Sequence, residues 1–484
     1  MSFALAWAVA FATGFVSLSC EVLWYRAYML GSEGSPLAFG LMLGSYLLGI
    51  AVGAEVARRM CRAESGPGDA RFLAPLGAFV LAANALSYLV VPVLARVVGR
   101  VDWEASLPLV MMAAGSLGAI LPLSAHFGVR PDDSAGARVS WLFAGNIAGS
   151  TIGTLLTGYV LLEFWTLSAV AAFLAVVGCA TAAVVFSRSS LRRRERFLSF
   201  GACALAGLLA VAARGASFDL VWERLLYRRA FTPDRRFALV KENRNDVICV
   251  TADRLIYGGG AYDGAISTSL HGDQNHVWRA YAMAAWHPAP REALVIGLSG
   301  GAWSEVLAHL PGLERLTIVE INPGYLDVIA QYPEVAGLLR NPRVSIVIDD
   351  GRRWLRRHPD RTFDLVVQNT SQHWRAHMTH LLSREHLELV KSRMRPGALF
   401  FYNTTDSPEA QASALAVFPH AGMLRNFILV SDRPLVADEA RYRRVLREFR
   451  LDGFPVWNFS REGEELLFEE VVTKSLRLVP RTEI

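Results

Sequence analysis

The chain has 484 residues, of which 52% are hydrophobic, and its 49 Lys and Arg against 44 Asp and Glu leave a formal net charge of +5. This length suffices for two or three domains. The modest charge, with arginines clustered between apolar segments, argues against a basic surface for nucleic acid, so no nucleic-acid partner is expected. The five cysteines contain no CxxC pair, which argues against a disulfide framework or a cysteine-based zinc site.

Residues 1–213 are about as apolar as a membrane protein. A helix needs roughly 20 apolar residues to cross about 30 Å of hydrocarbon. The sequence therefore predicts an α-helical polytopic membrane domain of six or seven spans, located in the cell membrane with the lipid bilayer as its partner. The candidate spans are 4–30, 36–57, 72–95, 105–125, 139–162 and 166–187, followed by a shorter apolar segment at 197–213.

Arginine placement orients these spans. Arginines cluster at 58–71 and at 188–196, and four predicted spans separate the two loops, so both lie on one side, which the positive-inside rule makes cytoplasmic. If 197–213 also crosses, the C-terminal half lies outside, whereas a nucleotide-type cofactor would place that half inside. We favour a cytoplasmic C-terminal domain, with 197–213 as a re-entrant or interfacial helix.

Small and ionisable residues also stand out within the spans. Glu21 lies late in the first span, five residues before Arg26, and an ionisable residue inside a span is a functional candidate. The alternatives are a structural pair between Glu21 and Arg26, or two side chains that reach the membrane surface. Glycines at four-residue spacing predict close helix packing, at Gly40/Gly44, Gly49/Gly53 and Gly145/Gly149/Gly153.

The second half of the chain has a mixed, soluble composition. Short β-prone runs broken by Asn, Asp and Gly predict a small antiparallel β unit with a lead-in helix over 231–290. From 291 onward the pattern alternates between strands and helices, which predicts an α/β Rossmann-like domain over 291–484. Its expected strands are 293–297, 316–322, 344–351, 363–369 and 398–405.

Polar residues end several of these strands. The first strand runs into the glycine-rich turn GLSGG at 297–301, the second ends in Glu320, and the third ends near Asp350. Glycines let the backbone approach a ligand, and an acid about 20 residues past such a turn accepts hydrogen bonds from ribose hydroxyls. The acid after the third strand is placed to meet the exocyclic amine of adenine. The turn lacks the full GxGxxG pattern, which favours an adenosine sulfonium ligand over NAD.

Residues from about 240 to 405 resemble the spermidine synthase (polyamine aminopropyltransferase) family, a branch of the class I S-adenosylmethionine-dependent methyltransferase fold. The residues that carry the resemblance are ALVIGLSGG, IVEIN, VIDDGRRWL, FDLVVQN and LLSREHLELVKSRMRPGAL. The segments 20–53 and 141–162 resemble the multi-span module that is fused to many bacterial spermidine synthase-like proteins. The last ~75 residues are not covered by the resemblance.

The resemblance implies a set of binding residues. Gly297 and Gly301 would line the site of S-adenosylmethionine or its decarboxylated form, the co-substrate. Glu320 would hold the ribose, and Asp350 with Gly351 the adenine. Tyr262 and Asp263, in GGGAYDG, would form a wall of the substrate pocket, although Asp-Gly is also an ordinary turn signal. No metal is expected.

The chain departs from the family pattern at two acids. The family carries an aspartate in the first turn, where GLSGG has none, and a second aspartate after the fourth strand, which is taken to be the catalytic base. Asn369 occupies the second position, and an amide cannot accept a proton at neutral pH. Asn369 is compatible with methyl transfer, where positioning of the nucleophile can suffice.

Three histidines follow Asn369. His373, His377 and His380 would share one face of a helix, but no carboxylate or cysteine completes an obvious metal site. His373 is the nearest to Asn369, and an imidazole titrates near neutrality, so His373 could supply the missing base. Roles at the surface or in packing remain the alternative for all three.

Three functions follow from these patterns. The first is a membrane-bound, spermidine synthase-like aminopropyltransferase that acts on a small-molecule amine. The second is a methyltransferase that acts on a lipid-soluble, membrane-delivered or other non-polyamine small molecule. The third is a transporter or sensor that binds an adenosine or polyamine ligand without turnover. Association into a homo-oligomer is left open.

Overall fold

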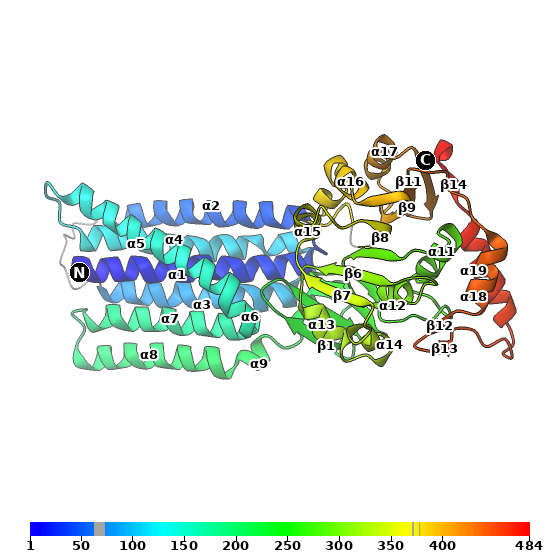
Figure 1. The fold of residues 1–484 in the computed structure, drawn as a ribbon. Helices are drawn as coiled ribbons and strands as arrows, with labels where there is room; N and C mark the ends of the chain where they lie inside the picture. Colours follow the sequence, from blue (N-terminus) through cyan, green and yellow to red (C-terminus); the bar gives the residue numbers. More distant parts are fainter. Residues whose placement is uncertain (62–72, 370–371, 377) are drawn as a thin grey trace. The chain divides into compact units, whose positions relative to one another are not determined.

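The computed structural model of the protein describes residues 1–61, 73–369, 372–376 and 378–484 (Figure 1). Contacts divide the chain into two compact units. The first, the helical unit, contains Met1–Arg236 and Glu242–Val247. The second, the α/β unit, contains Phe237–Lys241 and Ile248–Ile484. The domain boundaries expected from the sequence, after residues 213 and 290, stay predictions.

The described part of the helical unit contains seven helices that are long and apolar enough to cross a membrane. All six longer predicted spans are helical, and the seventh segment is helical as well. Three short helices follow them: α9 (Arg214–Ser217), α10 (Val221–Tyr227) and η4 (Arg228–Ala230). The seven are α1 (Phe3–Gly31), α2 (Pro36–Met60), α3 (Leu73–Val97), η2 with α4 (Trp103–Ser106, Leu107–Gly128), α5 with η3 and α6 (Ala135–Leu156, Thr157–Leu161, Leu162–Phe164), α7 (Leu167–Ser187) and α8 (Arg193–Ala212).

Helix α8 differs from the expectation for 197–213. It is one unbroken helix of 20 residues that runs alongside α7 (Figure 1). Near its end, the Ala210 carbonyl accepts a hydrogen bond of 3.1 Å from the Tyr88 hydroxyl on α3. The helix begins four residues earlier than expected, at Arg193, and is long and apolar enough to cross a membrane, and the expectation of a re-entrant or interfacial segment stays a prediction.

Glycines bring helices of this bundle into close contact, as their spacing predicts. A Cβ added at Gly53 on α2 would overlap the Gly115 carbonyl on α4, and one added at Gly149 on α5 would overlap the Phe11 carbonyl on α1. The prediction is wrong for Gly40 and Gly44, since no atom lies within 4 Å of a Cβ added at either position.

A buried arginine holds the segment 242–247 against the helices. Arg26 of α1 is only 9% exposed, and its Nη2 donates a hydrogen bond of 2.5 Å to the Asn243 carbonyl. The Glu242 carboxylate accepts the backbone N–H of Leu167, at the start of α7, at 2.7 Å, and the Trp222 indole N–H at 3.1 Å. No ion pair forms between Arg26 and Glu21 within the described residues, so that expected pair is not present.

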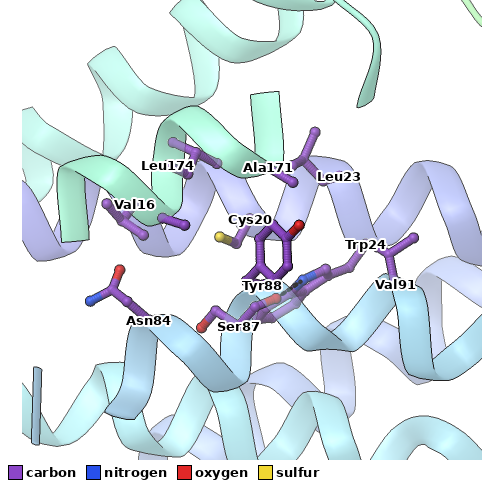
Figure 2. Close-up of a pocket in the computed structure, with 11 residues that line it drawn as sticks. Val16, Cys20, Leu23, Trp24, Asn84, Ser87, Tyr88, Val91, Ala171 and Leu174 are labelled. Atoms are coloured by element: carbon purple, nitrogen blue, oxygen red, sulfur yellow. Dashed lines mark hydrogen bonds between the residues drawn. The ribbon is translucent and has the colours of Figure 1, made fainter. Parts of the chain in front are cut away.

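The helical unit contains a small cavity between α1, α3 and α7 (Figure 2). Asn84, Ser87, Tyr88 and Cys20 contribute to its lining, and the Asn84 side-chain oxygen is buried without a partner among the described residues. The cavity volume of about 10 Å³ corresponds to about one water molecule. It is therefore too small to be a substrate site.

The α/β unit begins with the predicted antiparallel β unit. Its four strands pair in chain order and are followed by the lead-in helix α11 (Trp278–Trp286). Tight turns connect them, and the bulge between Ile256 and Tyr257 re-aims the strand that pairs with the YDG segment. The strands are β1 (Phe237–Glu242), β2 (Val247–Thr251), β3 (Leu255–Gly258) and β4 (Ala261–Ala265).

The main sheet has eight strands in the order β14-β10-β11-β9-β8-β5-β6-β7. The five predicted strands, β5 to β9, are parallel, which confirms a methyltransferase-like Rossmann fold. The antiparallel strands β10, β11 and β14 were not predicted. The strands are β5 (Glu292–Ile296), β6 (Arg315–Glu320), β7 (Val344–Ile348), β8 (Phe363–Gln368), β9 (Met394–Asn403), β10 (His420–Leu424), β11 (Phe427–Ser431) and β14 (Val479–Pro480).

Helices cover both faces of this sheet, because its strands are apolar on both sides. Along β9, Leu399 and Phe401 join the core that includes residues of α11, α12, α18 and α19, whereas Phe400 and Tyr402 join the core that includes residues of α15, α16 and α17. The helices are α12 (Ala302–Ala308), α13 (Gly324–Ile329), α14 (Pro333–Ala336), η5 (Gly337–Leu339), α15 (Gly351–Arg357), η6 (Thr379–Leu381), α16 (Arg384–Lys391), α17 (Pro408–Val417), α18 (Glu439–Arg447) and α19 (Glu464–Leu476).

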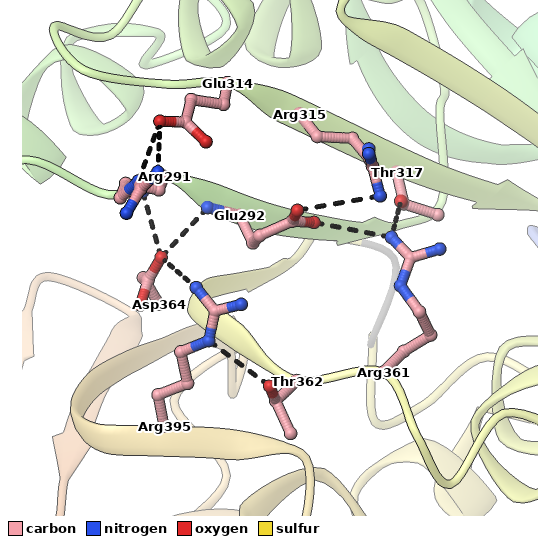
Figure 3. A network of polar contacts seen from close by, with 9 residues as sticks. All are labelled: Arg291, Glu292, Glu314, Arg315, Thr317, Arg361, Thr362, Asp364 and Arg395. Atoms are coloured by element: carbon pink, nitrogen blue, oxygen red, sulfur yellow. Dashed lines mark hydrogen bonds and ion pairs between the residues drawn. The ribbon is translucent and has the colours of Figure 1, made fainter.

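Ion pairs and hydrogen bonds join the amino ends of the parallel strands (Figure 3). The Asp364 carboxylate on β8 accepts the backbone N–H groups of Arg291 and Glu292 and a guanidinium N–H of Arg395, each at 2.9 Å. Arg361 in turn bonds Glu292 on β5 and Thr317 on β6. This network lies at the edge opposite the carboxyl ends of the strands and aligns the strands there. The carboxyl edge, where such sheets bind ligands, is not part of it.

Gly149→Ala should destabilise the helical unit, because the new methyl group would overlap the Phe11 carbonyl on α1. Gly44→Ala is the matched control, since its methyl group meets no atom within 4 Å and alanine favours helix. Thermal unfolding of the detergent-purified full-length protein should show a lower midpoint for the first variant and an unchanged or higher one for the second. Equal midpoints would refute close packing at Gly149.

Candidate active site

The glycine-rich turn after β5 requires glycine at two positions. Gly297 and Gly301 have φ angles of +90° and +76°, and Gly301 is the residue that precedes α12. Ser299 between them also has a positive φ of +50°, which is strained for a residue with a Cβ. These angles turn the chain sharply from β5 into α12 and leave backbone amides at the carboxyl edge of the sheet.

Glu320 fixes this turn from the neighbouring strand. Its carboxylate accepts the backbone N–H of Leu298 at 2.7 Å and that of Asn322 at 2.8 Å. The side chain is almost fully buried, and burial raises its pKa to about 7, against the opposing effect of these two donors. Glu320 therefore stands at the carboxyl end of β6, beside the turn, where the sequence predicts a ribose-binding acid.

Asp350 and Gly351 stand at the corresponding place after β7. One carboxylate oxygen of Asp350 caps α15, because it accepts the Arg353 backbone N–H at 2.7 Å. Gly351 has no room for a side chain, since an added Cβ would lie 2.7 Å from Cγ2 of Ile296. Asp350 is half-buried, and its second oxygen makes no hydrogen bond with a described residue. An adenine-binding role for this pair stays a prediction.

Asp263 is the centre of a contact that the sequence does not reveal. One of its carboxylate oxygens lies 2.7 Å from Nη1 of Arg375, in the loop after β8, and the other accepts the Tyr325 hydroxyl. The Ser299 hydroxyl donates to the Asp263 carbonyl. These bonds join β4, the glycine turn, α13 and the loop after β8. They also neutralise the carboxylate that the resemblance assigns to the substrate pocket.

Tyr262 lies next to Asp263 and is 38% exposed. Its pKa is raised to about 12, first by partial burial and then by its neighbours Tyr257, Asp273 and Asp263. The phenol is therefore protonated at neutral pH and can donate a hydrogen bond but cannot act as a base. The Tyr262 carbonyl accepts the Gln372 amide at 2.5 Å, so this tyrosine also contacts the loop after β8.

Asn369 directly follows β8 and is half-buried. Gln368 before it is fully buried, bonds the His386 ring at 2.8 Å and donates to the Leu381 carbonyl. Burial lowers the pKa of His386 to about 3, so that imidazole is neutral. The Asn369 amide makes no hydrogen bond with a described residue, so it is available to a ligand at the strand end.

Thr405 contacts His373 at two atoms. Its hydroxyl oxygen lies 2.6 Å from the His373 ring nitrogen Nδ1, accepts the His373 backbone N–H at 3.2 Å and lies 2.8 Å from the Thr404 carbonyl. When the hydroxyl donates to that carbonyl, the ring proton lies on Nδ1 and the lone pair on Nε2. Thr405, with a φ of +46°, is a strained β-branched residue, as is common at functional sites.

The predicted face of three histidines is only partly testable. His377 lies outside the described residues, and the described His373 and His380 are both exposed. Of the predicted catalytic residues, His373 lies in the loop after β8, and Tyr262 and Asp263 each bond a residue of that loop. Sequence reasoning missed Arg375, Tyr325, Gln372 and Thr405. The basic character of SQHWRAH was the one available signal for Arg375.

Replacing Glu320 should change the pH dependence of stability. Because folding raises the pKa of Glu320 to about 7, its contribution to stability is complete below about pH 4.5 and is lost as pH rises through 7. Melting midpoints of the wild type relative to those of Glu320→Gln should therefore fall between pH 5 and pH 8, as the free energy of unfolding falls by at most about 1.4 kcal/mol per pH unit. The exposed Glu448→Gln variant serves as control. Midpoints of wild type and Glu320→Gln that run parallel across this range would contradict the assignment.

Comparison with known proteins identifies the α/β unit. Residues 281–418 match the Spermine/spermidine synthase domain family. The chain is similar to polyamine aminopropyltransferase 2 of Streptomyces coelicolor, with 28% identity over 397 residues, 78% of this chain and 69% of that protein. It is also 28% identical over 278 residues to the polyamine aminopropyltransferase of Mycobacterium tuberculosis, where it spans about half, 51%, of the relative's length.

Among solved structures, spermidine synthase from Thermotoga maritima matches with 18% identity and a TM-score of 0.35, over 50% of this chain and 84% of that chain. The strand order, the glycine turn with Glu320 and the match over 281–418 agree with one another. Residues 281–418 therefore form a spermidine synthase-like domain within a methyltransferase-like fold.

Proposed function

We propose that the protein is a transferase of the spermidine synthase-like type, which moves the aminopropyl group of decarboxylated S-adenosylmethionine to an amine. The observation that carries the proposal is the Glu320 carboxylate, buried at the end of β6 and bonded to the glycine turn. The family match and the polyamine aminopropyltransferases that resemble this chain support it.

The co-substrate would lie along the carboxyl edge of the sheet. Gly297 and Gly301 would let its sulfonium end approach the backbone, Glu320 would accept its ribose hydroxyls, and Asp350 would accept the amine of its adenine. The Asp350 oxygen that does not cap α15 has no described partner, so it is available for this bond. The turn contains no acid for the aminopropyl ammonium group, so S-adenosylmethionine itself remains a second candidate.

Transfer requires a base for the acceptor amine. Its nitrogen attacks the carbon next to the sulfonium, the carbon–sulfur bond breaks, its electrons remain on sulfur as a neutral thioether, and the nitrogen loses a proton. Asn369 could orient the amine but cannot take that proton. We assign the role to Nε2 of His373, because Thr405, when its hydroxyl donates to the Thr404 carbonyl, holds the proton of the neutral ring on Nδ1.

One observation favours a second candidate function. Polyamines are cations that require carboxylates, yet Asp263 is paired with Arg375 and also accepts the Tyr325 hydroxyl. A neutral or singly charged acceptor needs no free carboxylate at this place. This arrangement favours a non-polyamine acceptor and is equally compatible with methyl transfer from S-adenosylmethionine.

His373→Ala should lower the transfer rate at least about 100-fold, the usual contribution of a general base. His380→Ala, which removes an exposed histidine of the same loop, should have little effect. The assay incubates the full-length protein with each of the two co-substrates and with putrescine, spermidine or a lipid extract, and detects the thioether products by mass spectrometry.

The outcomes of this assay separate the candidate functions. An aminopropyl product that depends on His373 supports the first proposal, and a methylated product supports the second candidate. Binding of either co-substrate by calorimetry without any product would instead indicate a binding protein, such as a transporter or sensor. If His373→Ala and His380→Ala react equally fast, the histidine is not the base.

We further propose that the helical unit spans a lipid bilayer with seven crossings. The end of α2, with Arg58 and Arg59, and the arginines just before α8 belong to one end of the bundle, which would be cytoplasmic. The chain leaves α8 at the other end, where Arg96 in the last turn of α3 donates to the carbonyls of Ala216 and Ser217. The residues after Ala212 would therefore be non-cytoplasmic, which replaces the cytoplasmic location expected if 197–213 did not cross.

Reporter fusions would test this orientation. Alkaline phosphatase, which is active only outside the cytoplasm, should be active when fused after Ile484 and inactive when fused after Ser190, in the loop before α8. A fluorescent protein that folds only in the cytoplasm should give the reverse pattern. Activity after Ser190 with none after Ile484 would contradict the orientation, and inactivity at both positions would mean that α8 does not cross.

A further inference from the structure

Three metal-ligating side chains meet in the α/β unit, away from the carboxyl edge of the sheet. Glu305 lies on α12, His309 directly follows that helix, and Asp452 lies in the turn between β12 (Arg450–Leu451) and β13 (Phe454–Pro455). One ligand atom from each lies within 4.8 Å of the other two. Nε2 of His309 is 3.4 Å from an Asp452 oxygen, and Nδ1 is 3.4 Å from a Glu305 oxygen.

Glu305 is a carboxylate in a place that ordinary folding does not explain. It is 1% exposed, and neither of its carboxylate oxygens has a hydrogen-bond partner among the described residues. The backbone amide of Leu338 stabilises its charged form slightly but does not reach hydrogen-bond geometry. A buried carboxylate without hydrogen bonds is costly, and proteins normally satisfy such a group with donors or use it to coordinate a metal.

His309 already has the hydrogen bond that metal-binding histidines make. Its Nδ1 lies 2.9 Å from the Glu305 backbone carbonyl, so geometry places the proton on Nδ1 and the lone pair on Nε2. A bond from the second ring nitrogen to a carbonyl fixes the tautomer and the ring orientation in metal sites. Nε2 faces the turn, where it now accepts the Asp452 backbone N–H at 3.2 Å.

The turn that carries Asp452 has a defined conformation. Asp452 and Gly453 both have positive φ angles, +48° and +85°, as the two central residues of a type I′ hairpin turn require. Gly337 lets the Asp452 carboxylate come close to η5, because a Cβ added there would lie 2.6 Å from one of its oxygens. The backbone thus presents this carboxylate to His309.

We propose that Glu305, His309 and Asp452 bind a divalent transition-metal ion, with Zn²⁺ the best match to their donor set. One imidazole nitrogen and two carboxylate oxygens are ligands that zinc accepts, with a fourth position left for water. Zinc–ligand bonds of about 2.0 Å place neighbouring ligand atoms about 3.3 Å apart, close to the 3.4 Å between His309 and Asp452. The three ligand atoms lie within 4.8 Å of one another, so a movement of the Glu305 oxygen by up to about 1.5 Å would complete the set.

The ion would connect two parts of the chain that are distant in sequence. The hairpin β12–β13 lies beyond residues 281–418, the part that matches the family, whereas α12 begins at the glycine turn. Zinc would therefore anchor the C-terminal hairpin to the helix that follows Gly301. Its role is structural, since none of its three ligands belongs to the proposed transfer site, and the inference does not depend on that function.

The test uses the full-length protein, purified in detergent and stripped with a chelator. Competition with a chromophoric zinc chelator should show one tight Zn²⁺ site per chain, and Zn²⁺ should raise the melting midpoint. Asp452→Asn and His309→Gln should each weaken binding at least about tenfold, and the control Glu448→Gln, at an exposed acid near the hairpin, should not. Cobalt substitution should give a visible absorption band that is lost in His309→Gln.

Asp452→Asn keeps the proposal testable if other variants fold poorly, because asparagine also favours the positive φ of this turn. Absence of saturable Zn²⁺ binding to the wild type would overturn the proposal. Binding that is equally tight in Asp452→Asn and His309→Gln would overturn it as well, since the ion would then occupy another site, for example one that uses cysteines.

Discussion

The hydrogen bonds of the Glu320 carboxylate to the Leu298 and Asn322 amides are the constraint on which the carboxyl edge depends. They join the end of β6 to the turn after β5, although the carboxylate is buried and loses hydration. The turn then presents Ser299 to the carbonyl of Asp263, and the Asp263 carboxylate holds Arg375. Residues from four separate segments are therefore positioned by one chain of contacts that begins at Glu320.

The sequence predicts the parts of this fold that depend on local patterns. The central parallel strands are buried on both faces, so they appear as short apolar runs such as ALVI, TIV and LVV, and Glu320 and Asp350 stand at or just after the ends of their strands. Helix α8 begins earlier than the apolar segment at 197–213 for a physical reason. Counting apolar residues begins at Phe197, but the helix begins at Arg193, and long arginine side chains in its first turn can extend away from the apolar region.

Contacts between distant segments could not be predicted in this way. Arg375 and Asp263 are 112 residues apart, and nothing in either local sequence specifies the other. Arg26 shows the same limit, because its nearest acid in sequence is Glu21, yet its guanidinium donates to the Asn243 carbonyl. The tautomer of His373 likewise depends on Thr405, 32 residues later. The sequence therefore predicts which residues are candidates for a site, but it does not predict which residues they contact.

The charges at the carboxyl edge of the sheet constrain the choice of acceptor more than the choice of co-substrate. Glu320 and Asp350 keep oxygens at the strand ends, as an adenosine ligand requires, whether or not its amino-acid part is decarboxylated. In contrast, the Asp263 carboxylate is paired with Arg375, and the residue after β8 is an amide, Asn369. A polycation would find few charges to bind there. Under the proposed function, a single amine that Asn369 orients and that loses its proton to His373 after attack suits this arrangement better than a polycation.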